Sequence, residues 1–143
     1  MKLPSILLVD DEEADRYLLK RRLSAMDDEA TVFEASDGDV GLAFLSDFET
    51  GTAKYGDAFP PALIFLDINM PRVGGFEFLR RFDDLRRDDP RYRSSVILML
   101  TSSARKDDIA SAAVRSSVGG HITKGDLDDE LLRRVIEGAT RAL

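Results

Sequence analysis

Short runs of apolar residues alternate along the chain with longer segments in which apolar residues recur at helical spacing. The apolar runs predict five strands, at residues 5–9, 31–35, 62–66, 96–100 and 120–123. Two of them, at 62–66 and 96–100, are apolar throughout, and the run at 5–9 is apolar after Ser5, which is typical of a parallel sheet with both faces covered. The run at 31–35 is more polar and the run at 120–123 is short, so both suit the edges of the sheet.

The segments between these runs predict five helices, at residues 14–26, 38–48, 76–85, 106–117 and 127–143. Strands that alternate with helices indicate a single α/β domain with a mostly parallel sheet and helices on both faces. The helix at 106–117 has a thin, Ala- and Ser-rich apolar face. Residues 49–61 are predicted to form a long loop, either a contact surface or an insertion, because such connections usually span about 2–6 residues.

Composition and charge exclude several classes of protein. The 143 residues suffice for one domain with a real core, and 43% are hydrophobic, which argues against disorder. The net charge is −7 and the basic residues lie among acidic ones, so we expect no nucleic-acid surface. There is no cysteine, no export signal and no apolar run near the roughly 20 residues of a membrane helix. We therefore expect a cytoplasmic protein with no membrane partner.

Polar side chains follow four of the predicted strands at their ends. Asp10 and Asp11 follow the first strand, Asp67 the third, Thr101 the fourth and Lys124 the fifth. Ligands of open parallel sheets bind beyond the carboxyl ends of the strands, so these groups are expected at one rim. Singly, an acid or hydroxyl there more often caps a helix, and a lysine is more often solvated. Together they indicate a shared site.

The chemistry of this set points to phosphate. Hard carboxylate oxygens favour Mg²⁺ or Mn²⁺ over zinc, and crowded carboxylates repel one another unless a cation intervenes. An ammonium group and a hydroxyl suit the oxygens of a phosphoryl group. One carboxylate has a further possible role as the nucleophile that forms an aspartyl phosphate.

Five motifs together resemble the receiver domain of two-component response regulators. In order and at receiver spacing they are LLVDDEE, FLDINMP, VGGFEFL, LTSS and HITKG, and the resemblance covers nearly the whole chain. It implies a flavodoxin-like fold, a doubly wound five-stranded parallel sheet of order 2-1-3-4-5 with five helices. It also implies that residues 1–143 form a single receiver domain with no output domain.

The resemblance assigns a role to each residue at the rim. Asp67 would be the phospho-acceptor. The Asp11 and Asp67 side chains and the Asn69 backbone carbonyl would bind Mg²⁺ or Mn²⁺, and Asp10 would assist through water. Lys124 would pair with the phosphoryl oxygens.

Two residues would report phosphorylation. Thr101 would turn towards the phosphoryl group, and His121 stands where the family usually has a switch tyrosine or phenylalanine. A lone histidine on a short strand is more often structural than catalytic, so we assign it no phosphotransfer role. The family also usually has a cis Lys-Pro peptide where this chain has Lys124-Gly125, which leaves the local geometry open.

The implied function is that of a stand-alone response regulator. It would accept a phosphoryl group from the phosphohistidine of a sensor histidine kinase and signal by a changed surface or dimer. It would catalyse only its own phosphorylation and dephosphorylation. Residues 105–117, 121–123 and 127–143 would form the face for a homodimer or partner. A narrower resemblance, to single-domain regulators associated with bacterial phytochrome kinases, names a bacteriophytochrome as the kinase.

Two other functions are open to this sequence, and a third is excluded. A pseudo-receiver would keep the fold as a binding module without using the acceptor. An aspartyl-nucleophile Mg²⁺ phosphatase would need an acid two residues after the nucleophile, where this chain has Asn69. A flavodoxin-like nucleotide binder would need a glycine-rich loop after the first strand, where acidic residues stand instead.

Overall fold

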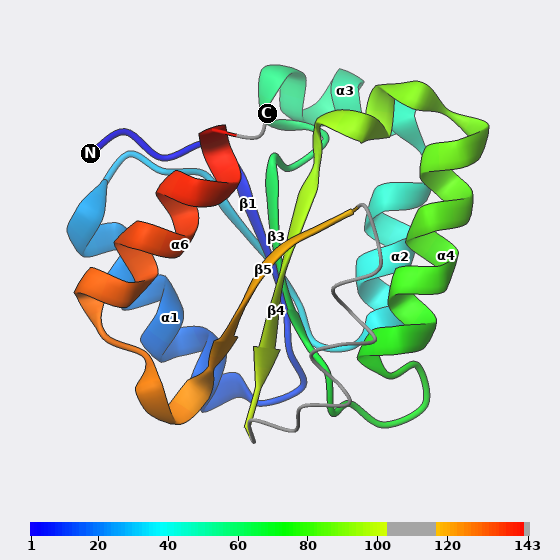
Figure 1. Cartoon of the computed structure of the whole chain (residues 1–143). Coiled ribbons are helices and arrows are strands. Elements are labelled where there is room, and N and C mark those ends of the chain that lie inside the picture. Colours follow the sequence, from blue (N-terminus) through cyan, green and yellow to red (C-terminus); the bar gives the residue numbers. More distant parts are fainter. Residues whose placement is uncertain (103–116, 142–143) are drawn as a thin grey trace.

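The chain folds around a central parallel sheet with helices on both faces (Figure 1). The structure, a computed structural model, describes residues 1–102 and 117–141. The strand order is β2-β1-β3-β4-β5, which confirms the predicted doubly wound sheet and places the runs at 31–35 and 120–123 at its edges. The strands are β1 (Ile6–Val9), β2 (Val32–Ala35), β3 (Leu63–Asp67), β4 (Val96–Thr101) and β5 (Val118–Thr123).

Helices α1 and α6 cover one face of the sheet, and α2 and α4 lie on the other (Figure 1). Four predicted helices are present with ends shifted by a few residues, and the helix predicted at 106–117 lies almost wholly outside the described residues. The α-helices are α1 (Glu13–Met26), α2 (Gly38–Ser46), α3 (Phe48–Tyr55), α4 (Gly75–Asp88) and α6 (Asp129–Arg141). The 3₁₀ helices are η1 (Gly56–Ala58), η2 (Pro90–Ser94) and η3 (Lys124–Asp126).

The prediction of a long loop at 49–61 is wrong, because most of that segment is α3 followed by η1. Asp47 ends α2 and caps α3: its carboxylate accepts hydrogen bonds from the Thr50 N–H at 3.0 Å and the Thr50 hydroxyl at 2.7 Å. Gly51 lets α3 pack against the Phe59 ring, where a Cβ would come within 2.6 Å of ring carbons. The cap and this close packing turn an apparent loop into a helix.

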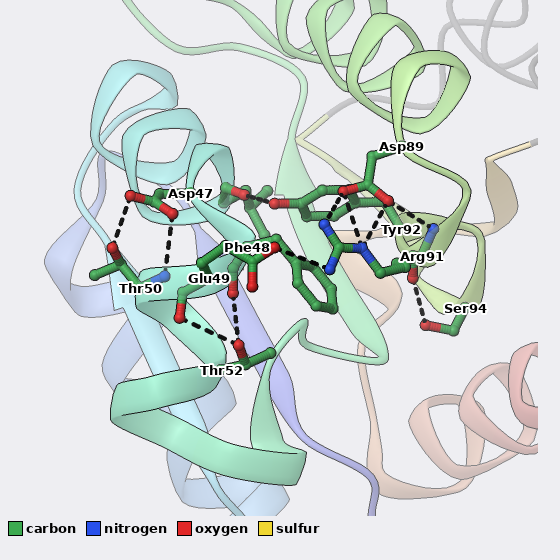
Figure 2. Close-up of polar contacts among 10 residues, drawn as sticks. Asp47, Phe48, Glu49, Thr50, Thr52, Asp89, Arg91, Tyr92 and Ser94 are labelled. Carbon is green, nitrogen blue, oxygen red and sulfur yellow. Dashed lines mark hydrogen bonds and ion pairs between the residues drawn. The ribbon is translucent and has the colours of Figure 1, made fainter.

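An aromatic cluster joins α3 to η2, and Figure 2 shows two of its members, Phe48 and Tyr92. The cluster consists of Phe33, Phe44, Phe48, Tyr55, Phe59 and Tyr92. The Arg91 guanidinium lies 3.8 Å from the centroid of the Phe48 ring and its Nη1 donates to Glu49 at 3.0 Å. The buried Tyr92 hydroxyl donates to the Leu45 carbonyl, in the last turn of α2. The segment before β3 and the segment before β4 are therefore tied together at the amino ends of the strands.

The central strands of the sheet, β1, β3 and β4, are buried on both faces. Within β3, residues Leu63 to Leu66 are all 0% exposed, and alternate side chains enter one core cluster on each face. Within the described residues, no helix has the length and apolar character needed to cross a membrane. Because the interiors of β1, β3 and β4 are apolar, the polar side chains of these strands lie at their carboxyl ends.

Candidate functional site

The structure brings the predicted polar residues to the carboxyl edge of the sheet. Asp10 directly follows β1, Asp67 and Thr101 are the last residues of β3 and β4, and Lys124 follows β5 at the start of η3. In the register of the sheet Asp67 pairs with Leu100, so Thr101 lies one residue beyond it. Asp10 and Asp67 are each 3% exposed and Thr101 is 1% exposed, so the site is set into the protein.

Three carboxylates converge at this edge. Oxygen atoms of Asp10, Asp11 and Asp67 lie within 4.8 Å of one another. Backbone groups orient two of them, because the Glu12 N–H donates to Asp10 Oδ1 at 2.9 Å and the Asn69 N–H donates to Asp67 Oδ1 at 3.2 Å. A set of hard oxygens at this spacing fits Mg²⁺ or Mn²⁺.

Lys124 is the cation of the site. Its Nζ lies 2.8 Å from Asp10 Oδ2, 2.9 Å from Asp15 Oδ2 and 3.5 Å from Asp67 Oδ2. Burial opposes the charge, but the hydrogen bonds to Asp10 and Asp15 outweigh it and hold the pKa of Lys124 above its usual value. The ammonium is therefore charged and shared among three carboxylates.

Asp15 is the contact that the sequence analysis missed. It lies in the first turn of α1, within an acid-rich stretch in which no spacing distinguishes one carboxylate from the next. Only the packing of α1 beside η3 selects it as a partner of Lys124.

Asp67 is the carboxylate of the site whose pKa is raised. Burial, and then the negative charge of Asp10, raise its pKa from 3.8 to about 6, although the Lys124 ammonium and the Asn69 N–H lower it in part. A divalent cation among these carboxylates would relieve the same repulsion, which agrees with the donor set.

Asp67→Asn is expected to raise the free energy of unfolding at pH 7 by about 2 kcal/mol in the absence of divalent cations. In the folded state Asp67 has a pKa of about 6, compared with 3.8 for an unperturbed aspartate. Ionisation of Asp67 therefore lowers the stability of the wild type as pH rises from about 4 to 6. The advantage of the variant should vanish below about pH 4. Urea unfolding at pH 7 and pH 4 measures this difference, and an equal difference at both values would contradict the assignment.

The two expected switch residues differ in their surroundings. Thr101 is buried at the end of β4, one residue beyond the register partner of Asp67, whereas His121 is exposed on the edge strand β5, where it pairs in register with Met99. The Lys124–Gly125 peptide is trans, because the only cis bond among the described residues is Phe59–Pro60. A Cβ at Gly125 would meet nothing within 4 Å, so the missing proline leaves open space.

Comparison with known proteins gives one family. A family model described as the response regulator receiver domain matches residues 6–136. The nitrate/nitrite response regulator protein NarL of Escherichia coli strain K12 is 30% identical over 135 residues, 94% of this chain and 54% of that protein. Response regulator Rcp1 of Synechocystis is 30% identical over 132 residues, 91% of this chain and 82% of Rcp1. The chain thus spans about half the length of NarL.

Two solved structures of response regulators superpose on most of this chain. The bacteriophytochrome response regulator AtBRR superposes with a TM-score of 0.73 at 26% identity, over 97% of this chain and 94% of that chain. The Mn²⁺-bound form of Rcp1 superposes with a TM-score of 0.69 at 27% identity, over 94% of this chain and 90% of that chain.

Proposed function

The chain belongs to the response regulator receiver family, and on that premise we propose that Asp67 accepts a phosphoryl group from the phosphohistidine of a sensor histidine kinase. The observation that carries the proposal is the setting of Asp67, a buried carboxylate between Asp10 and Lys124. A general role in phosphorylation-dependent signalling follows from the family itself.

The side chains at the carboxyl edge of the sheet have different roles in the phosphoryl transfer. A carboxylate oxygen of Asp67 attacks phosphorus, the bond from phosphorus to the imidazole nitrogen breaks, and that nitrogen keeps the electron pair. Lys124 donates hydrogen bonds to the phosphoryl oxygens and balances part of their charge. Asp11, Asp67, the Asn69 carbonyl and, through water, Asp10 would hold Mg²⁺ or Mn²⁺. The bound cation would neutralise the remaining negative charge of the phosphoryl group and the carboxylates.

We propose that phosphorylation of Asp67 changes a surface of the protein that lies away from the site. Thr101, buried next to the carboxylates, turns its hydroxyl towards the phosphoryl oxygens, and His121 at the sheet edge follows. The proposed responding surface comprises residues 105–117, 121–123 and 127–143, of which 105–116 and 142–143 lie outside the described residues, and it would bind a partner or a second copy. The likeness to AtBRR, a bacteriophytochrome response regulator, supports a bacteriophytochrome as the kinase. In this proposal the chain is a cytoplasmic single receiver domain, and a signalling protein rather than an enzyme.

Intact mass after incubation with acetyl phosphate, with and without Mg²⁺, tests the proposal. We expect wild type to gain one phosphoryl group only when Mg²⁺ is present, and Asp67→Asn to gain none. Asp57→Asn is the matched control, because Asp57 is exposed in η1, which precedes the amino end of β3, whereas Asp67 lies at its carboxyl end. It should behave as wild type.

An adduct on Asp67→Asn, or one that forms without a divalent cation, would overturn the assignment. If wild type takes no phosphoryl group from acetyl phosphate or from a phosphorylated histidine kinase, a pseudo-receiver binding module becomes the better description. The phosphatase alternative has less support, because the Asn69 amide cannot serve as a general acid.

A further inference from the structure

We infer that Asp15 is a positioning residue that competes with the phosphoryl group on Asp67 for the ammonium of Lys124. The inference rests on the proposed function and adds to it a built-in limit on how firmly the phosphorylated state is held. Its basis is the geometry around Lys124, which links the first turn of α1 to the start of η3; these two segments lie side by side in Figure 1.

The distances show where the ammonium is held. An ammonium group has three N–H donors, and two of them are taken by Asp10 at 2.8 Å and Asp15 at 2.9 Å. Asp67 Oδ2 is farther away, at 3.5 Å. Before phosphorylation Lys124 is therefore bound more closely to Asp15 than to the acceptor.

Burial separates the two close partners of Lys124. The side chain of Asp10 is 4% exposed, so that carboxylate has little access to water and keeps its need for a cation. The side chain of Asp15 is 42% exposed, so water can replace Lys124 as its partner. Asp15 is thus the contact that Lys124 can give up when a phosphoryl group arrives.

There is room for this exchange beside the ion pair. A pocket of about 140 Å³ lies between α1 and η3, and its lining includes Asp15, Lys124 and the apolar side chains of Leu18, Leu100 and Leu127. Because the space adjoins both partners, the Lys124 and Asp15 side chains can separate without displacing the core.

Charge gives the direction of the effect. A phosphoryl group brings about −1.5 to −2 charges and three acceptor oxygens. Removing the Asp15 charge frees one donor of Lys124 for these oxygens. Partly exposed ion pairs are modest in energy, so we expect binding of a phosphoryl analogue to tighten by roughly two- to five-fold.

The test is the affinity for beryllofluoride, an analogue of the phosphoryl group, titrated in saturating Mg²⁺ and followed by amide chemical shifts. Asp15→Asn should bind it roughly two- to five-fold more tightly than wild type. Glu13→Gln removes the same charge from the same helical turn, where Glu13 is exposed and makes no ion pair with Lys124 among the described contacts, and should bind as wild type does. In a Lys124→Gln background, adding Asp15→Asn should change nothing.

The outcomes separate this inference from the function on which it rests. If wild type is phosphorylated at Asp67 but Asp15→Asn binds beryllofluoride no more tightly, the competition is refuted and the function stands. Equal tightening by Glu13→Gln, or in the Lys124→Gln background, would show a general charge effect and also refute it. If wild type takes neither beryllofluoride nor a phosphoryl group, function and inference fall together. The dispersion of the amide spectra shows that each variant is folded.

Discussion

Replacing Lys124 with glutamine is expected to lower the free energy of unfolding by about 2–3 kcal/mol at pH 7 without divalent cations. The substitution leaves Asp10 and Asp67, which are both buried, without the cation that lies 2.8 Å and 3.5 Å from their oxygens. The estimate is at the low end for a broken buried pair because the side chain of Lys124 is still 19% exposed. Phosphorylation of Asp67 should slow on the order of 100-fold, because the donor to the phosphoryl oxygens is lost.

Urea unfolding at pH 7 and pH 5, with acetyl phosphate labelling of the same samples, measures both effects. The stability loss should be smaller at pH 5, because Asp67, whose pKa is already about 6 in wild type, then carries a proton. Lys20→Gln is the matched control: Lys20 pairs with Glu34 at 3.2 Å but is 47% exposed, so its loss should cost less than about 1 kcal/mol. A Lys124→Gln variant as stable as wild type at pH 7 would contradict this account of the site.

Gly75→Ala should lower the free energy of unfolding by about 2–3 kcal/mol and reduce phosphorylation at the same time. A Cβ at Gly75 would lie 2.7 Å from the Ile68 Cα and 2.9 Å from the Asp67 carbonyl oxygen. Both contacts are with backbone, and the Gly75 N–H also donates to the Ile68 carbonyl at 2.9 Å. The strain can be relieved only by moving the chain that carries the acceptor.

Thermal and urea unfolding, each with acetyl phosphate labelling, check this prediction. Gly138→Ala is the matched control, because Gly138 lies within α6 and a Cβ there would meet nothing within 4 Å. Alanine is the better helix former, so the control should gain roughly 0.5–1 kcal/mol. If Gly75→Ala matched wild type in stability and labelling, the close approach of α4 to the backbone of Asp67 and Ile68 would have no role.

The sequence predicted the sheet and most of the site for one physical reason. Strands of a parallel sheet have their carboxyl ends at one edge, so residues that follow buried strands meet there regardless of their distance along the chain. That rule brings together Asp10, Asp67, Thr101 and Lys124. Asp15 does not follow a strand. Its contact with Lys124 depends on the position and orientation of α1 on the face of the sheet. Apolar periodicity predicts the helix but not that orientation.

Helix α3 escaped prediction for a different reason. Its sequence, FETGTAKY, has glycine at its centre and two threonines, which are weak helix formers. The helix depends on the Asp47 cap and on the packing of Gly51 against Phe59, a residue of the next connection. Tertiary contacts therefore override local propensity here.

The aromatic cluster also determines which optical signals the protein offers. The chain has no tryptophan and three tyrosines. Tyr17 is 58% exposed on α1, whereas Tyr55 and Tyr92 pack against phenylalanine rings at the amino ends of the strands. Near-ultraviolet circular dichroism will therefore follow the packing of the end of the sheet that lies away from Asp67. A phosphorylation that rearranges only the carboxyl edge will leave this signal unchanged, so the spectrum separates local rearrangement from global unfolding.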